Sequence, residues 1–264
     1  MNDFPELINE ALKRVHPSWE AVLVEGLGAM TRQTPNYLDD LAKDDFLPTQ
    51  GRLFAAFSQP MDAVRYVLIG EGPYPREESA SGYCFMDAAV RDIWAEGGLS
   101  KQVNRATSLR NFVKMLLVAD GTIAAEKTGS EAMKKVSAMA LSESSAYIRT
   151  LAEMQDTMLA NGFLLLNAAL VFRAHVPVPK ETRAWQPFMV TVLDALAKSR
   201  KGADRLPVLI LWGKMAEKLV SMPFASSYRC VASEHPYNLS FIQNTDMQNL
   251  FKPMRLLFKP EISD

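Results

Sequence analysis

Four short apolar runs along the chain predict buried β-strands. They are Val64–Ile69, Phe163–Leu166, Pro207–Trp212 and Tyr228–Ala232. None of the runs alternates between apolar and polar positions. We therefore expect each strand to be buried on both faces, as in a parallel sheet that is covered by helices.

Helical patterns lie between these runs. From Ser108, which we expect to cap a helix, apolar residues follow the i, i+3, i+4, i+7 spacing as far as Gly121. Three further helical stripes follow, at 147–158, 187–197 and 215–220. Alternating strands and helices predict an α/β fold. We expect a single domain over residues 1–264, with a helical excursion near 119–145, where no aromatic residue occurs.

The composition is that of a globular protein with a full core. Hydrophobic residues make up 48% of the 264 residues and charged residues 22%. There is no run of eighteen apolar residues, so we expect no membrane span. Two cysteines, Cys84 and Cys230, cannot form a disulfide framework, which favours a reducing cytoplasm. The three histidines and two cysteines show no ligand spacing, so we expect neither a metal nor another cofactor.

Charge is unevenly distributed along the chain, although the net charge is only −1. Residues 1–50 carry four Lys/Arg and nine Asp/Glu, whereas Phe163–Ser233 carries ten basic and four acidic residues, a net charge of +6. This basic segment could face a polyanion such as a nucleic acid. The alternative is that its basic residues only solvate helix surfaces.

Polar and aromatic residues follow each of the four expected strands. In an open α/β sheet, ligands bind beyond the carboxyl ends of the strands. A buried amide, aromatic rings and a histidine at that edge would form a planar, polar pocket suited to a heterocycle. The segments concerned are Gly70–Pro75 with Gly82–Phe85, Asn167, Trp212–Lys214 and His235–Ser240.

Three of these segments resemble motifs of the uracil-DNA glycosylase superfamily, nearest its family 1. Gly-Glu-Gly-Pro-Tyr at 70–74 is similar to Gly-Gln-Asp-Pro-Tyr, and 164–167 reads Leu-Leu-Leu-Asn, as in the family. His-Pro-Tyr-Asn-Leu-Ser at 235–240 resembles His-Pro-Ser-Pro-Leu-Ser. Matches run in order from about Pro48 to Leu257. The resemblance implies a four-stranded parallel sheet flanked by helices, and an enzyme that flips its target nucleotide out of the duplex.

The resemblance also implies roles for individual residues. Asn167 would hydrogen-bond the uracil edge, Phe85 would stack on the base, and Tyr74 would exclude the methyl group of thymine. His235 would donate to the uracil oxygen on which charge collects as the glycosidic bond breaks. Leu239 would enter the base stack. The remaining matches are to loops that grip DNA phosphates, at Gln50, Ser108, Gly213, Lys214 and Ser240. The implied partner is DNA, single- or double-stranded, and we expect the protein to be a monomer.

The sequence departs from the family pattern at the catalytic Asp, which falls on Gly72. Glu71 precedes it, and another branch of the superfamily uses the Glu of a Gly-Glu-Ala-Pro-Gly motif at that point. Adjacent side chains of an extended chain point in opposite directions, so Glu71 would need a local twist, which Gly70 and Gly72 could permit. Further departures are Pro75 in place of His, and Tyr237-Asn238 in place of Ser-Pro.

Two functional hypotheses follow from this pattern. The first is a DNA glycosylase that hydrolyses the N-glycosidic bond of uracil or a related base, slowly, with His235 and Glu71 as its catalytic residues. The alternative is a catalytically silent module that binds DNA or a flipped base on the same fold. A third class, an unrelated α/β protein that binds a small molecule, is disfavoured by the order of the motifs.

Overall fold

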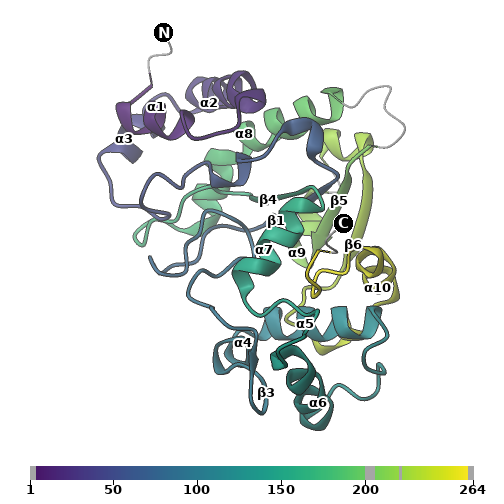
Figure 1. Cartoon of the computed structure of the whole chain (residues 1–264). Helices are drawn as coiled ribbons and strands as arrows, with labels where there is room; N and C mark the ends of the chain where they lie inside the picture. Colours follow the sequence, from purple (N-terminus) through teal and green to yellow (C-terminus); the bar gives the residue numbers. More distant parts are fainter. Residues whose placement is uncertain (1–3, 200–205, 220–221, 261–264) are drawn as a thin grey trace. The chain divides into compact units, whose positions relative to one another are not determined.

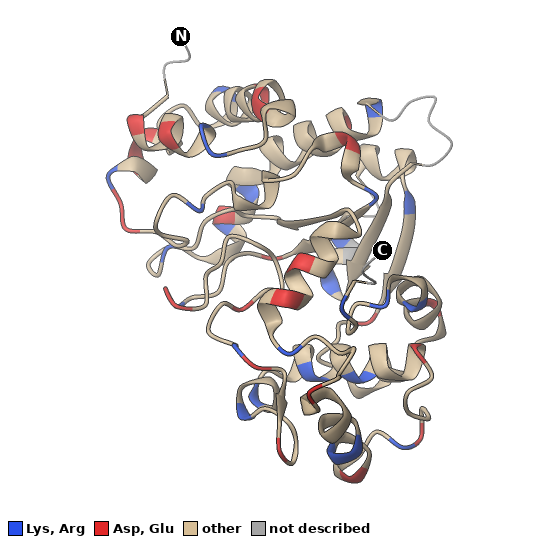
Figure 2. Ribbon diagram, viewed as in Figure 1, with Lys and Arg blue, Asp and Glu red and all other residues tan. Residues whose placement is uncertain are grey.

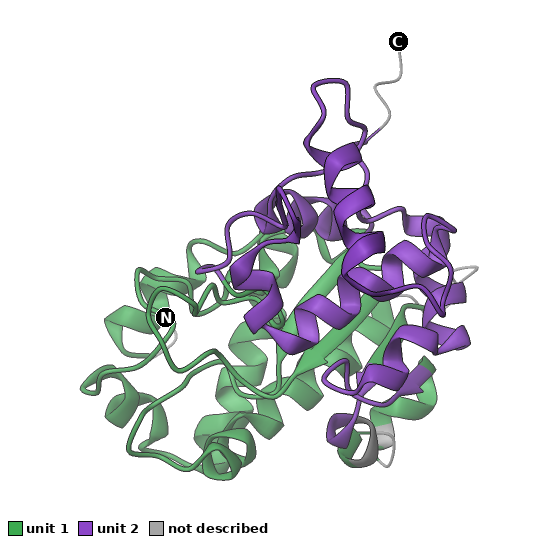
Figure 3. Ribbon diagram, turned by 90° about the horizontal axis from the view of Figure 1, so that it is seen from below, with its two compact units in different colours: residues 1–87, 162–210, 217–230 green, residues 88–161, 211–216, 231–264 purple. Residues whose placement is uncertain are grey.

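The computed structural model describes residues 4–199, 206–219 and 222–260 (Figure 1). Val220, which ends one expected helix, and Arg200, Lys201 and Arg205 of the basic segment lie outside these residues. The chain divides into two compact units, each built from three separate segments (Figure 3). Unit 1 comprises 1–87, 162–210 and 217–230, and unit 2 comprises 88–161, 211–216 and 231–264.

A four-stranded sheet has the order β4-β1-β5-β6. Its strands are Tyr66–Gly70 (β1), Phe163–Asn167 (β4), Val208–Trp212 (β5) and Arg229–Ser233 (β6). β1 pairs in parallel with β4 from Tyr66↔Phe163 to Gly70↔Asn167, and in parallel with the start of β5. All five residues of β4 are buried, as expected of a strand covered on both faces. The predicted fold class, an α/β protein with a four-stranded parallel sheet flanked by helices, is confirmed.

The helix that contains Ser108 begins differently from the prediction. α5 spans Thr107–Ala119, and its N-cap is Ala106, which makes no side-chain capping bond. Ser108 therefore lies within the first turn, and its predicted role as the cap is wrong. An apolar stripe locates the buried face of a helix, but the capping residue depends on where the backbone leaves the helical region.

Two other helices also begin away from their predicted starts. α7 spans Leu151–Ala160 and starts from a capping box between Thr150 and Glu153, so Tyr147 precedes it. α8 spans Val178–Ser199 and contains Pro187. The proline removes one backbone donor, but the buried face on both sides of it keeps the helix continuous.

Unit 1 packs its helices through large aromatic side chains. α2 (Glu20–Gln33) lies beside α8, at the top of Figure 1. A Cβ atom on Gly26 of α2 would lie 2.8 Å from the ring of Phe188, so the glycine permits the close approach of the two helices. The unit also contains α1 (Glu6–Leu12) and α3 (Tyr37–Ala42). Together with α2, these helices carry six of the nine acidic residues of 1–50 (Figure 2).

Unit 2 is mainly helical. The segment 119–145 contains α6 (Ser130–Leu141), which packs against a small hairpin, and the Ser137 hydroxyl donates to the carbonyl of Ala95. That the whole chain forms one domain stays a prediction. Further elements are β2 (Trp94–Ala95), β3 (Gly98–Leu99), α4 (Lys101–Arg105), α9 (Lys214–Leu219, whose last residues belong to unit 1), the 3₁₀ turn η5 (Leu239–Gln243) and α10 (Thr245–Phe251).

Within the described ranges, no helix combines the length and the apolar character that crossing a membrane requires.

Candidate functional site

Asn167 ends β4 directly beside the end of β1. The residue is only 3% exposed, and its register partner is Gly70. A Cβ atom on Gly70 would lie 2.8 Å from Asn167 Oδ1, so only glycine leaves room for this amide. Within the described part of the chain, no hydrogen bond of the Asn167 side chain is found. Neither amide atom of Asn167 is among the fully enclosed side-chain atoms of the described residues that lack a partner, so the amide reaches open space, where it can bind a ligand.

Tyr74 and Phe85 follow β1 in the same unit. The Tyr74 hydroxyl donates weakly to the Phe85 carbonyl oxygen over 3.4 Å. Burial, with the nearby Asp87 carboxylate, raises the pKa of Tyr74, so its phenol stays neutral. Phe85 has φ of +65°, a left-handed conformation that costs an aromatic residue roughly 1–3 kcal/mol.

Cys84 holds this bend against the sheet. Its backbone N–H donates to the Leu165 carbonyl over 3.1 Å, and its thiol donates to the Leu68 carbonyl over 3.2 Å. Burial raises the pKa of the Cys84 thiol, which therefore stays protonated and unreactive. The strained conformation of Phe85 is thus enforced by two bonds between its neighbour and the strands.

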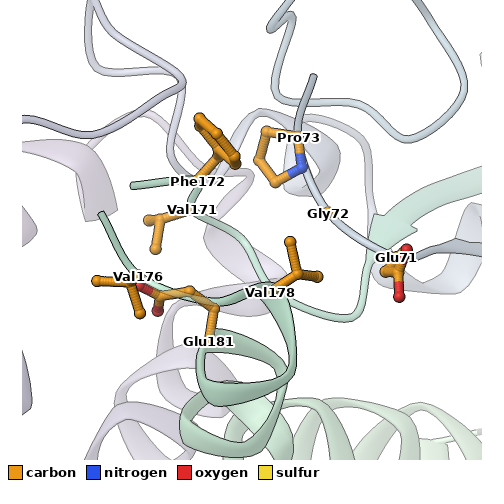
Figure 4. Close-up of a pocket in the computed structure, with 9 residues that line it drawn as sticks. Glu71, Gly72, Pro73, Val171, Phe172, Val176, Val178 and Glu181 are labelled. Atoms are coloured by element: carbon orange, nitrogen blue, oxygen red, sulfur yellow. The ribbon is translucent and has the colours of Figure 1, made fainter. Parts of the chain in front are cut away.

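The motif at 70–74 borders a small pocket of about 130 Å³ (Figure 4). Glu71, Gly72 and Pro73 form one part of its lining, and the chain after β4 forms the rest. Glu71 is exposed, and its carboxylate lies 4.0 Å from Lys218 Nζ. Neither Gly70 nor Gly72 adopts a positive φ, so the glycine-specific twist that we expected around Glu71 is not used.

A buried polar network is built around Glu181, which lines this pocket, and the sequence analysis missed it. Glu181 is 3% exposed, accepts from Arg173 Nε over 2.6 Å, and accepts a short hydrogen bond from the Tyr37 hydroxyl. Trp185 Nε1 donates to the Tyr37 oxygen over 2.8 Å, and Asp44 accepts from Arg173. In the view of Figure 4, Val178 lies between the side chains of Glu71 and Glu181.

His235 follows β6 and belongs to unit 2. Its Nδ1 accepts a hydrogen bond from the backbone N–H of Tyr237 over 3.1 Å. A ring nitrogen that accepts carries no proton, so the neutral imidazole bears its proton on Nε2. The ring of Trp212 lies edge-on to the imidazole, with 6.5 Å between the centroids. His235 is exposed, and the loop that carries it fixes the tautomer of its imidazole.

The His235 loop, residues 235–240, is held from α5. The buried Asn111 side chain donates to the Pro236 carbonyl over 2.8 Å and approaches the carbonyls of Tyr237 and Asn238 at 3.3 and 3.4 Å. A polar residue inside the apolar stripe of α5 is the sequence signal that could have pointed to Asn111. The sequence alone could not name the loop to which it binds.

The remaining predicted DNA contacts also fall into the two units. Gln50 is exposed in unit 1 at a φ of +60°. In unit 2, Lys214 is exposed at the start of α9, and Leu239 is 69% exposed. Ser240 bonds to the Glu234 carboxylate, a bond that helps to hold the pKa of Glu234 below its usual range despite burial. Ser108 is half-buried near the start of α5, and Gly213 precedes Lys214.

No family model matches the chain. Solved structures nevertheless share its fold. The wild-type UNG of Nitratifractor salsuginis is 38% identical, covers 97% of this chain and 96% of its own, and superimposes with a TM-score of 0.84. The uracil-DNA glycosylase of mimivirus, 16% identical with a TM-score of 0.56, supports the fold alone.

Curated relatives extend this similarity. The uracil-DNA glycosylase of Corynebacterium glutamicum is 26% identical over 234 residues, which cover 86% of this chain and 81% of that protein. The uracil-DNA glycosylase of Phocaeicola vulgatus is 30% identical over 190 residues, 71% of this chain and 67% of that protein. The chain belongs to the uracil-DNA glycosylase family. Among the residues that the structure describes, no three or more His, Cys, Asp or Glu side chains are grouped so that they could hold a metal ion.

Proposed function

We propose that the chain is a DNA glycosylase that hydrolyses the N-glycosidic bond of uracil, or of a closely related base, in DNA. The observation that carries this proposal is the Asn167 side chain: the residue is only 3% exposed, and within the described ranges its amide makes no hydrogen bond. Its O and NH₂ groups match the donor and acceptor of a uracil edge. Cytosine presents the opposite pattern, so the same amide disfavours it.

The aromatic residues of unit 1 support this assignment. Phe85, half-buried and held in a strained conformation, supplies a rigid face on which the base stacks. Tyr74 supplies neutral bulk that excludes a 5-methyl group and thereby thymine. A site with these residues binds the flipped base through hydrogen bonds to its edge and through stacking on its face.

His235 is the proposed electrophilic residue. In hydrolysis the bond between C1′ and the base nitrogen breaks, and its electron pair goes to the base. A water oxygen bonds to C1′, and the proton that the water loses ends on the departing base. Negative charge therefore collects on the base oxygen, where a fixed donor lowers the barrier. The Nε2–H of neutral His235 is such a donor, because Nδ1 is occupied by the Tyr237 N–H.

The chain lacks the carboxylate with which the family motif would position the water. Gly72 stands where the family motif has Asp, and it supplies no side chain. We propose that Glu71 acts in its place from an exposed position near Lys218, and that hydrolysis is slow as a result. Gly72 also favours a second candidate function, a protein that binds uracil-containing DNA without cleaving it.

DNA is the proposed partner, in single- or double-stranded form, bound by a monomer. Lys214 is the exposed cation among the proposed contacts, and Gln50, Ser108, Gly213 and Ser240 complete the phosphate-binding set. Leu239 is the residue that enters the base stack, because its side chain is 69% exposed in the loop that carries His235.

The test is incubation with single-stranded oligonucleotides that contain one uracil, cytosine or thymine, followed by alkali to reveal abasic sites. We expect cleavage of the uracil substrate alone. Asn167→Ala should lose this selectivity, whereas Asn36→Ala, a change at an exposed asparagine, should keep it. Binding of uracil-DNA with no abasic sites would instead support the binding protein. Absence of both binding and cleavage would refute both functions.

A further inference from the structure

The two most exposed large apolar side chains of the described residues lie two positions apart in the His235 loop. Tyr237 is 68% exposed and Leu239 is 69% exposed, whereas Met139, on α6, is 53% exposed. Exposing a tyrosine ring to water forgoes the stabilisation that burial of its apolar surface would give. Leu239 already has a proposed role, but Tyr237 has none. The family motif has a small serine at that position.

The backbone under these two side chains is held at several points. Asn111 binds the Pro236 carbonyl and approaches those of Tyr237 and Asn238, while the Tyr237 N–H donates to the imidazole of His235. The Glu234 carboxylate bonds to Ser240 and accepts from Asn244, which ties down the other end of the loop. The side chains of Tyr237 and Leu239 therefore project from a pre-organised backbone, so that little conformational entropy is lost when they bind.

Positive charge lies beside the Asn111 contact. Arg110 and Lys114 flank Asn111 on α5, where Figure 2 shows basic residues along the helix, and η5, which begins at Leu239, packs against α5. Neither residue forms an ion pair within the described part of the chain. Burial and the nearby Arg110 lower the pKa of Lys114, as expected of two cations held together without a counter-ion. This arrangement favours a partner that combines phosphate groups with flat apolar surfaces.

We propose that Tyr237 is a base-stacking residue, which packs its ring on a base next to the flipped nucleotide while Leu239 fills the vacated position. The proposal rests on the proposed DNA-binding function and adds a residue that the family motif does not contain. Base stacking on a tyrosine does not depend on the sequence, because every base has a π-face. Tyr237 therefore contributes to affinity for DNA rather than to the choice of base.

The experiment measures binding of a fluorescein-labelled, single-stranded oligonucleotide by anisotropy. The oligonucleotide contains one 2′-fluoro-substituted deoxyuridine, whose glycosidic bond resists hydrolysis. Tyr237→Phe keeps the ring, Tyr237→Ser introduces the residue of the family motif, and Met139→Ser is the control on an exposed side chain of the same unit. Within the described part of the chain, Tyr237 takes part in the hydrogen bonds of the loop through its backbone N–H and carbonyl alone. Its side-chain variants should therefore fold, which thermal unfolding checks.

We expect Tyr237→Ser to weaken binding by roughly 5- to 100-fold, the range that loss of one base–aromatic stack gives. Tyr237→Phe and Met139→Ser should bind within about 2-fold of wild type, a range that corresponds to less than 0.5 kcal/mol. Wild type that binds, with Tyr237→Ser equal to it, would overturn the stacking role and leave the proposed function intact. Wild type that binds no oligonucleotide would overturn both. Loss of affinity in Tyr237→Phe as well would identify the hydroxyl, not the ring, as the contact.

Discussion

A Cβ atom on Gly213 would lie 3.0 Å from the Cβ atom of His235. Gly213 also has a φ of +55°, and its N–H donates to the Ser233 carbonyl over 2.9 Å. The end of β5 thus sets the position from which the imidazole projects. Any side chain at 213 must displace the histidine or distort the turn.

Gly213→Ala should therefore lower the turnover of uracil-DNA and destabilise the protein. The matched control is Gly121→Ala, because Gly121 has a φ of +74° but no atom within 4 Å of an added Cβ. In both variants an alanine in the left-handed backbone conformation should lower the free energy of unfolding by about 1 kcal/mol. Thermal unfolding and abasic-site formation measure the two effects. If Gly213→Ala were as active as Gly121→Ala, close packing against His235 would be irrelevant to catalysis.

Gly72→Asp should raise the rate of hydrolysis. A Cβ atom there would meet only the Ala169 carbonyl oxygen, at an ordinary 3.7 Å, so the side chain fits. A positioned acid or base contributes about 10²–10⁴-fold, and we expect about 10²-fold in this loop. The control Gly97→Asp places the same residue where no atom lies within 4 Å of the added Cβ, and it should leave the rate of hydrolysis unchanged. The measurement is single-turnover kinetics on uracil-DNA, and an unchanged rate would contradict the assignment of position 72.

Asn111→Asp should disrupt the His235 loop. The substitution replaces the buried donor with an acceptor that faces three carbonyl oxygens, of which Pro236 is the nearest at 2.8 Å. Leaving buried carbonyls without a donor costs about 1–3 kcal/mol. We expect lower thermal stability, together with a loss of kcat that exceeds any change in KM. Asn249, exposed on α10, provides the control Asn249→Asp. A variant with full kcat would show that the loop holds its position without Asn111.

Stability should fall as the pH rises through the range of the Asp120 carboxyl. Burial raises the pKa of Asp120 from 3.8 to about 6, although Arg255 and Lys252 act against this shift. Between these values the native state binds more protons than the unfolded chain, so the free energy of unfolding decreases with pH until about pH 6.

Asp120→Asn should therefore stabilise the protein at pH 7.5 by about 1 kcal/mol, after allowance for solvent screening of this partly exposed group. The gain should vanish near pH 4, where the wild-type carboxyl is protonated in both states. Asp156→Asn, at an exposed position of α7, serves as the control. Urea unfolding at both pH values tests this, and an equal gain at both would contradict it.

Lys214→Ala should weaken DNA binding by a similar factor for every sequence. Each phosphate contact releases counter-ions, so the slope of log Kd against log salt should decrease by roughly 1. Lys43→Ala, in the acidic N-terminal segment, should leave the slope unchanged. Anisotropy titrations over a range of salt concentrations measure it, and a base-dependent loss would argue against a phosphate contact.

The strands were well predicted from the sequence because burial on both faces leaves an uninterrupted apolar run. β4 and β5 lie within one residue of the predicted ends. β1 starts at Tyr66, two residues after Val64, because Val64 is the C-cap of a 3₁₀ turn at Met61–Ala63. Helix starts were less well predicted, since Thr150 begins its helix through a capping bond that an apolar stripe does not reveal.

The candidate site was predictable only where its residues follow strands. Asn167 was expected at a strand end because it interrupts an apolar run. Asn111 and Glu181 were missed, because their partners are distant in sequence and only the folded chain pairs them. The functional roles of all site residues remain predictions, whereas the packing that holds Asn167 and the tautomer that the loop sets for His235 are properties of the structure.

The interleaving of the two units has a consequence for synthesis on the ribosome. β1 emerges early, but its partners begin only at Phe163 and Val208, and unit 1 also needs 217–230. Unit 2 needs 231–264 as well as 88–161, so neither unit is complete while the chain is still short. The backbone N–H and C=O groups along the edges of β1 therefore stay unpaired in the nascent chain, which makes this segment prone to aggregation until β4 and β5 are synthesised. No single cut in the gene yields either unit intact.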